Sequence, residues 1–213
     1  MPETAYFGLR LPKDMRETAD HIPLIQITPT ESSHPLLRRA LRSLEDFSHV
    51  ILTSRTTVEL LFGHFGVSPV QLQNATIIAV GQATARACEQ HGLRVHHTAE
   101  KETAEGVIRV LKSLHLRGSY VFWPHSAQAR HVILNYLLAA AIPNLCCPLY
   151  RTEPRRPEDL PDLKQYSNYI FTSPSTVHAF TEVFGRLPEA GKSQSIGPVT
   201  AKALKKVLTN SKS

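Results

Sequence analysis

The stretch from Ile170 to Gly185, "IFTSPSTVHAFTEVFG", decides the fold of this chain. An apolar run meets a Thr-Ser-Pro-Ser cluster, after which apolar residues recur at helical spacing. This pattern predicts a strand, a tight turn and a helix. The stretch from Ile51 to Gly66, "ILTSRTTVELLFGHFG", has the same plan, and Ser54 stands where Ser173 stands in the later copy. The sequence therefore contains the same predicted strand–turn–helix unit twice.

A second motif follows each copy in the same order. "AVGQATARA" (Ala79 to Ala87) is echoed by "SIGPVTAKA" (Ser195 to Ala203). The first pair of motifs is offset by 119 positions and the second by 116. A repeat of this length indicates duplicated domains and excludes a solenoid of short units.

Both motifs place Ser, Thr or Gly where a parallel strand ends and a helix begins. Backbone N–H groups at such a point lack partners and the helix dipole is positive, so the position suits an anion. Ligands of open α/β sheets bind beyond the carboxyl ends of the strands. The simpler interpretation, that these residues only cap helices, stays open for each motif taken alone.

Apolar, β-branched runs alternate with segments of helical period along most of the chain, which predicts an α/β fold. Two extended, Pro-punctuated segments flank a central block of four strand–helix units and are expected to pair with each other. The predicted organisation is a discontinuous terminal domain, an inserted domain and two paired linkers: 1–22 with 153–213, 30–144, and 23–29 with 145–152.

Composition excludes several classes of protein. Of the 213 residues 42% are hydrophobic and 20% charged, as in ordinary soluble domains. No apolar run is long enough to cross a bilayer, and the N-terminus lacks the pattern of a secretory signal. Three cysteines make no disulfide framework, which favours a reducing cytoplasm.

A net charge of +6 points to an acidic partner or to a plainly basic surface. No basic patch is interleaved with aromatic residues, so nucleic acid is the weaker candidate. Common hydrolase, zinc-protease and nucleotide motifs are missing. The histidines His96, His97, His125 and His131 have no companion ligands at metal spacing and are expected at the surface or at strand edges. No acidic pair stands out, so an enzyme of this sequence would work by positioning and hydrogen bonding.

The ordered series "ILTSRTTV", "AVGQATARACEQHGLRV", "PLYRTEP", "YIFTSPSTVHAF" and "SIGPVTAKAL" resembles the uroporphyrinogen-III synthase family. The resemblance implies two flavodoxin-like parallel-sheet domains joined by a two-stranded β linker. Val199 departs from the family pattern, which has a hydroxyl residue there. There is little room for a helix after the first strand, and the chain stops soon after its last motif. The terminal domain is therefore expected to be shortened.

The resemblance implies a cyclising hydro-lyase of tetrapyrrole and heme biosynthesis. Such an enzyme converts hydroxymethylbilane to uroporphyrinogen III, inverting ring D and losing water, in a cleft between its domains. It needs no metal and no organic cofactor. The eight carboxylates of the substrate fit the basic charge. We expect a cytoplasmic monomer that binds neither nucleic acid nor membrane, with transient hand-over from the preceding enzyme left open. The alternative is a non-catalytic protein of the same descent that binds anions or tetrapyrroles.

The resemblance also implies roles for single residues. Tyr150 matches the family's linker tyrosine, the candidate for helping the hydroxyl leave, although its ring could instead simply pack at the hinge. Two arginines of the expected site could equally be solvated surface residues. The expected substrate-binding residues, which include the repeat-mates in the inserted domain, are Arg10, Ser54, Gly81, Thr84, Arg130, Ser173, Gly197 and Thr200.

Overall fold

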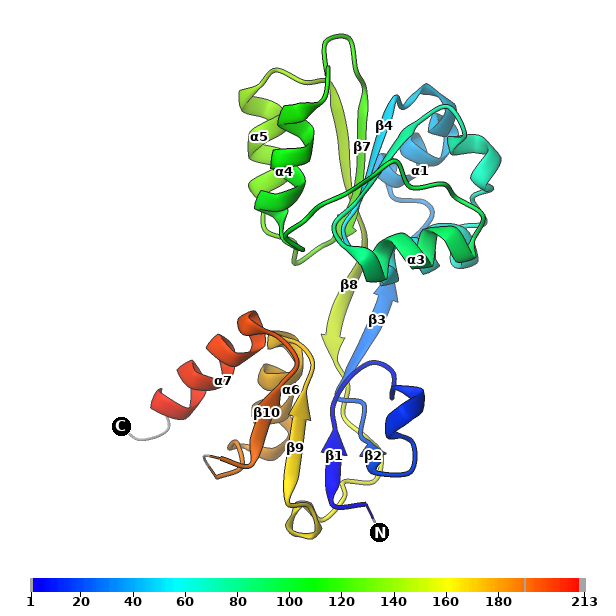
Figure 1. Ribbon diagram of the computed structural model, residues 1–213. Helices are drawn as coiled ribbons and strands as arrows, with labels where there is room; N and C mark the ends of the chain where they lie inside the picture. Colours follow the sequence, from blue (N-terminus) through cyan, green and yellow to red (C-terminus); the bar gives the residue numbers. More distant parts are fainter. Residues whose placement is uncertain (1, 190, 211–213) are drawn as a thin grey trace. The chain divides into compact units, whose positions relative to one another are not determined.

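The computed structural model describes residues 2–189 and 191–210. The chain divides into two compact units, each with its own core. We name them the terminal unit (Met1–Thr28 with Thr152–Ser213) and the inserted unit (Pro29–Arg151). Each is described in turn, with the labels of Figure 1.

The inserted unit alternates strands and helices. Its strands are β4 (His49–Leu52), β5 (Thr76–Ala79), β6 (His97–Thr98), β7 (Val121–Ser126) and β8 (Asn144–Pro154), the last of which continues past the unit. Its α-helices are α1 (Pro35–Arg42), α2 (Arg55–Glu59), α3 (Gln82–Gln90), α4 (Ala104–Ser113) and α5 (Val132–Ala139). A π-helical turn (Leu60–His64) continues α2, and 3-10 turns lie at Leu44–Asp46 and Pro69–Leu72.

These strands form a parallel sheet in the order β8-β7-β4-β5-β6. All four residues of β4 are buried, as expected of a central parallel strand. Helix α2 contacts α3, and α4 contacts α5; Figure 1 shows the second pair side by side. After β4, the strands β5 and β6 are added on one side of it, and β7 and β8 are then added on the other side. The strand order therefore reverses between β4 and β7. Such a reversal is where α/β sheets open a crevice for a ligand.

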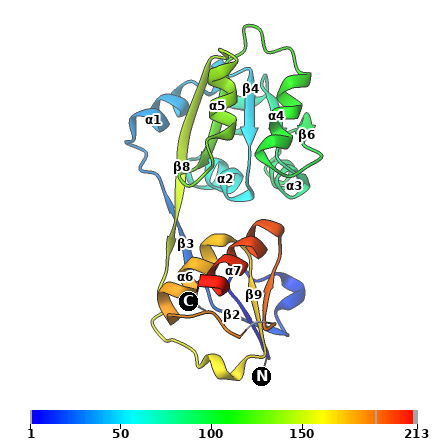
Figure 2. The same ribbon diagram turned by 90° about the vertical axis from the view of Figure 1, so that its left-hand side faces the viewer.

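Strand β3 (Ile25–Pro29) lies beside β8. The N–H of Thr30 donates to the carbonyl of Leu149 and that of Arg155 donates to Leu24, so the two strands run antiparallel. Both strands can be followed through Figure 2. The paired β linker of the predicted fold class is thus confirmed, but β8 is more than a linker: its residues 144–150 also pair with β7.

The terminal unit contains a four-stranded parallel sheet in the order β10-β9-β1-β2. Its elements are β1 (Thr4–Tyr6), β2 (Ala19–His21), β9 (Asn168–Phe171), α6 (Pro174–Phe184), β10 (Ser193–Ser195) and α7 (Pro198–Asn210). The core of the unit is aromatic: the ring of Phe7 lies 5.0 Å from those of Phe171 and Phe180. Between β1 and β2 the structure has a single 3-10 turn, Lys13–Met15, where the sequence predicted little or no helix.

The predicted α/β class, parallel sheets and repeated strand–helix units are confirmed. One α-helix and one strand were not predicted. Helix α1 buries only Leu37 and Ala40 among its arginines, and β2 buries only Ala19. Their apolar patterns are too sparse to reveal a helix or a strand by periodicity alone.

Candidate functional site

The two repeated serines have the same local geometry. Ser54 and Ser173 both adopt extended backbone and both cap the helix that follows. The Oγ of Ser54 accepts the N–H of Thr57 at 3.0 Å, and that of Ser173 accepts the N–H of Thr176 at 3.3 Å. The capping role that the sequence left open is therefore real in both units. It does not exclude a ligand, because a cap satisfies only one of the free N–H groups of a helix end.

Tyr150 lies at the carboxyl end of β7, on the neighbouring strand β8. It pairs with Ser126 beyond a register irregularity, and its carbonyl accepts the N–H of Ala127 at 2.7 Å. Its ring is buried, and its hydroxyl lies 3.1 Å from the Oγ of Ser54. Two predicted site residues therefore meet at the reversal point of the inserted sheet.

A layer of aromatic side chains is built on β7 beside this point. The indole N–H of Trp123 donates to Oγ1 of Thr53 at 3.3 Å. The imidazole of His125 lies 4.4 Å from the Trp123 ring, and its Nδ1 lies 2.8 Å from the carbonyl oxygen of Ser126. Burial lowers the pKa of His125. This packed imidazole was not predicted to lie beside the candidate site.

The prediction of surface or strand-edge histidines is wrong for His125. It is buried because the first five residues of β7 are all enclosed within the unit. His97 does lie on the edge strand β6, and His131 is exposed. Among residues 2–189 and 191–210, no group of three or more His, Cys, Asp or Glu side chains is arranged to hold a metal ion.

The amino end of α3 already holds a carboxylate. Oε1 of Glu102 accepts the N–H of Gln82 at 3.0 Å. The same carboxylate lies against Gly81, in the space that a Cβ there would need. Thr84 is buried in the first turn of α3. The position thus has the anion-accepting chemistry predicted from the sequence, but the described anion is a side chain of the protein.

Arg130 lies in the loop after β7 and pairs with the first turn of α4. Its guanidinium donates to both carboxylate oxygens of Glu105, at 2.8 and 3.1 Å, and both side chains are exposed. This hydrogen bonding is the main reason that the pKa of Glu105 falls to about 2. Arg130 is thus an exposed arginine with a carboxylate partner of its own.

In the terminal unit, the predicted residues lie at the starts of α6 and α7. Gly197 directly precedes α7, and Thr200 is buried in its first turn. Ile196 and Val199 flank this glycine with 63% and 68% of their surfaces exposed. Arg10 is an exposed residue after β1. These two side chains put exposed apolar surface beside the start of α7. The sequence analysis did not predict this surface, because it noted Val199 only as a residue that replaces the hydroxyl residue of the family pattern.

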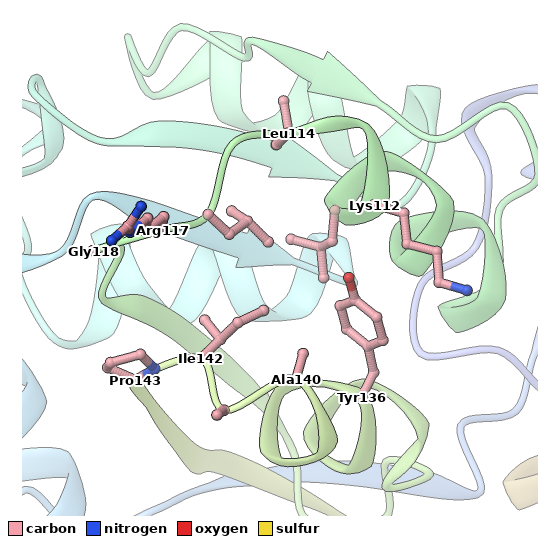
Figure 3. Close-up of a pocket in the computed structure, with 11 residues that line it drawn as sticks. Lys112, Leu114, Arg117, Gly118, Tyr136, Ala140, Ile142 and Pro143 are labelled. Carbon is pink, nitrogen blue, oxygen red and sulfur yellow. The ribbon is translucent and has the colours of Figure 1, made fainter.

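Each unit has a cavity at the amino ends of its parallel strands, away from the carboxyl ends where the predicted site residues lie. One, of about 430 Å³, lies in the inserted unit where the chain enters β7 and β8, and Figure 3 shows the Tyr136 hydroxyl pointing into it. The other, of about 490 Å³, lies in the terminal unit where the chain enters β9 and β10. The linings given by the described residues include none of the predicted site residues, so neither cavity belongs to the candidate site.

The three cysteines are free, and burial raises the pKa of each to about 12. Cys147 is fully buried in β8, where its side chain packs in the core of the inserted unit. In the part of the chain that the structure describes, no helix is both long enough and apolar enough to cross a membrane.

Comparison with known sequences identifies one family. The model of the family described as uroporphyrinogen-III synthase HemD matches residues 13–210. A putative uroporphyrinogen-III synthase of Methanothermobacter thermautotrophicus is 30% identical over 185 residues. That alignment covers 79% of this chain and 72% of the relative.

Solved structures give the same result for the fold. A mutant uroporphyrinogen III synthase of the extremely thermophilic bacterium Thermus thermophilus matches with a TM-score of 0.64 at 18% identity, covering 97% of this chain and 89% of that one. Uroporphyrinogen-III synthetase of Helicobacter pylori 26695 matches with the same TM-score, identity and coverage.

Proposed function

This chain belongs to the uroporphyrinogen-III synthase family of cyclising lyases, and from that premise we propose that it converts hydroxymethylbilane to uroporphyrinogen III with inversion of ring D and loss of water. The observation that carries the proposal is the contact between Tyr150 and Ser54 at the carboxyl ends of the central strands. A phenol is held there by a second hydroxyl at the point where ligands of such sheets bind.

Tyr150 is proposed to donate its proton to the departing hydroxyl of the substrate. Loss of that hydroxyl as water leaves an azafulvenium cation, which the substituted carbon of ring D attacks to give a spiro intermediate. Fragmentation and reclosure then invert the ring, and the proton released when its pyrrole is restored balances the proton taken up by the water. A positioned acid contributes typically about 10²–10⁴-fold to such a step.

The carboxylates of the substrate are proposed to bind at the helix starts of both units. Support comes from Glu102, whose carboxylate accepts the first N–H of α3 as a substrate carboxylate would. Ser54, Gly81, Thr84 and Arg130 would contribute from the inserted unit, and Arg10, Ser173, Gly197 and Thr200 from the terminal unit. The buried hydroxyls of Thr84 and Thr200 would act by shaping the first turns of their helices. The apolar pair Ile196 and Val199 would contact pyrrole rings.

A cytoplasmic location, a monomeric state and transient hand-over from the preceding enzyme remain predictions. The first is supported by the three free thiols, which suit a reducing compartment. A positive net charge favours a polyanionic substrate that arrives by diffusion.

The test is to incubate the purified protein with freshly prepared hydroxymethylbilane and to separate the type I and type III isomers of the product. We expect type III to dominate, at a rate far above spontaneous closure. Type I product alone, at the spontaneous rate, would overturn the proposal. Tight binding of hydroxymethylbilane together with that result would favour the non-catalytic, tetrapyrrole-binding alternative.

A further inference from the structure

The hydroxyl of Ser54 has three described partners. It accepts the N–H of Thr57 at 3.0 Å, lies 2.8 Å from the Oγ1 of Thr57, and lies 3.1 Å from the hydroxyl of Tyr150. A serine hydroxyl carries one hydrogen and two acceptor positions, so these three contacts saturate it. Since one acceptor position holds a backbone N–H, one neighbouring hydroxyl must donate to Ser54 and the other must accept from it.

The burial of Thr57 decides which hydroxyl donates. The Thr57 side chain is 0% exposed and Ser54 is the described partner of its hydroxyl, whereas Tyr150 keeps 6% of its surface exposed, so an unpaired hydrogen costs more at Thr57 than at Tyr150. If that hydroxyl only accepted, its hydrogen would be enclosed without an acceptor, and a buried unsatisfied donor is costly. Thr57 therefore donates to Ser54, and Ser54 donates to Tyr150.

This direction leaves the hydrogen of Tyr150 pointing away from Ser54. The phenol oxygen accepts from Ser54, so its own O–H is available to another acceptor. We infer that Thr57 is a positioning residue that sets the direction of this hydrogen-bond chain and so presents Tyr150 as a donor. The inference rests on the proposed function, in which the acceptor is the departing hydroxyl of the substrate.

The second copy of the motif shows that capping alone does not require this arrangement. In the terminal unit, Oγ1 of Thr176 donates to the carbonyl of Ser173 at 2.7 Å and accepts the N–H of Ser173 at 3.3 Å. The Oγ of Ser173 in turn accepts the N–H of Thr176, so the two residues close on each other as a capping box. The same Ser-x-x-Thr spacing thus ends in a closed box in one unit and in a chain of hydroxyls in the other.

The first test compares Thr57→Val, which keeps the shape and the backbone N–H but removes the hydroxyl, with Thr57→Ser, which keeps the hydroxyl. We expect Thr57→Val to lower kcat about tenfold, with KM changed by less than about twofold, and Thr57→Ser to retain activity. In a Tyr150→Phe background, Thr57→Val should lower kcat no further, because the residue acts through the phenol. An equal loss in both backgrounds would show a merely structural role and overturn the inference.

The second test does not depend on activity. In protein labelled with ¹³C at the tyrosine Cζ, the Tyr150 resonance is identified by its loss in Tyr150→Phe. It should shift in Thr57→Val and stay in place in Thr57→Ser and in the matched control Thr176→Val. A resonance that does not move in Thr57→Val overturns the inference even if the wild-type protein is active. Conversely, a wild-type protein that forms no type III isomer overturns the proposed function while this measurement still decides the hydrogen-bond chain.

Discussion

The hydroxyls of Ser54 and Tyr150 lie 3.1 Å apart although 96 positions separate the two residues in the chain. Ser54 follows the central strand β4, and Tyr150 lies on β8, with β7 between the two strands. The contact joins the first copy of the repeated motif to the only residue for which the sequence predicts a catalytic role. Substitutions within the inserted unit can therefore test the role that is proposed for Tyr150.

Replacing Tyr150 with phenylalanine should remove the proposed acid while keeping the buried ring. We expect kcat to fall about 100-fold, since a positioned acid contributes within this range, and KM to change little. Steady-state assays that follow the type III isomer measure both constants. Unchanged kcat would show that the ring only packs on β8.

Two substitutions of Ser173 should separate its capping role from substrate binding. Ser173→Ala removes the cap of α6 and should lower the free energy of unfolding by about 1 kcal/mol. Ser173→Asp keeps a capping oxygen but puts a negative charge where a substrate carboxylate is proposed to bind. It should unfold like the wild type and raise KM roughly tenfold. Denaturant titration and steady-state kinetics check the two effects, and an aspartate variant with normal KM would remove Ser173 from the binding site.

Glu102 should compete with the substrate for the amino end of α3. In Glu102→Gln the amide oxygen can still accept the N–H of Gln82, but the charge that repels an incoming carboxylate is gone. We expect KM to fall roughly threefold, in keeping with the energy of a charge at a helix end. The matched control is Glu100→Gln, an exposed glutamate two residues earlier. Equal KM values for the wild type and both variants would exclude the α3 end as a substrate site.

His125 should make the protein less stable as the pH falls. Burial lowers its pKa below the ordinary value of 6.5, so the unfolded chain takes up a proton more readily than the folded one. The stability that neutral His125 provides is complete above pH 6.5 and is lost as the pH falls from there towards the lowered pKa. Denaturant titrations between pH 7.5 and 5 should show a smaller decline for His125→Asn than for the wild type. The exposed control His115→Asn should retain the full decline; if both variants follow the wild type, burial of His125 does not carry the effect.

The sequence determined the repeated units and their caps. Ser54 and Ser173 were each expected at the start of a helix, and each accepts an N–H from that helix. Gly92 follows the end of α3 with a φ of +78°, a conformation that glycine adopts without strain. These features follow from interactions among residues within one turn of each other, which local sequence specifies.

Only the tertiary structure decided which of these residues meet. Ser54 reaches Tyr150 because β7 lies between β4 and β8, and Glu102 reaches the start of α3 from a loop 20 positions away. The sequence analysis expected His125 at the surface or at a strand edge, because nothing in its neighbourhood reveals that β7 is an inner strand. Strand order and register depend on the burial of apolar surface over the whole unit, so contacts across the sheet are not encoded in any short stretch. The two Ser-x-x-Thr motifs show this difference between local and tertiary information most directly. Their spacing specified two helix caps. Their surroundings decided that Ser173 forms a closed capping box with Thr176, whereas Ser54 links Thr57 to the buried Tyr150 by hydrogen bonds.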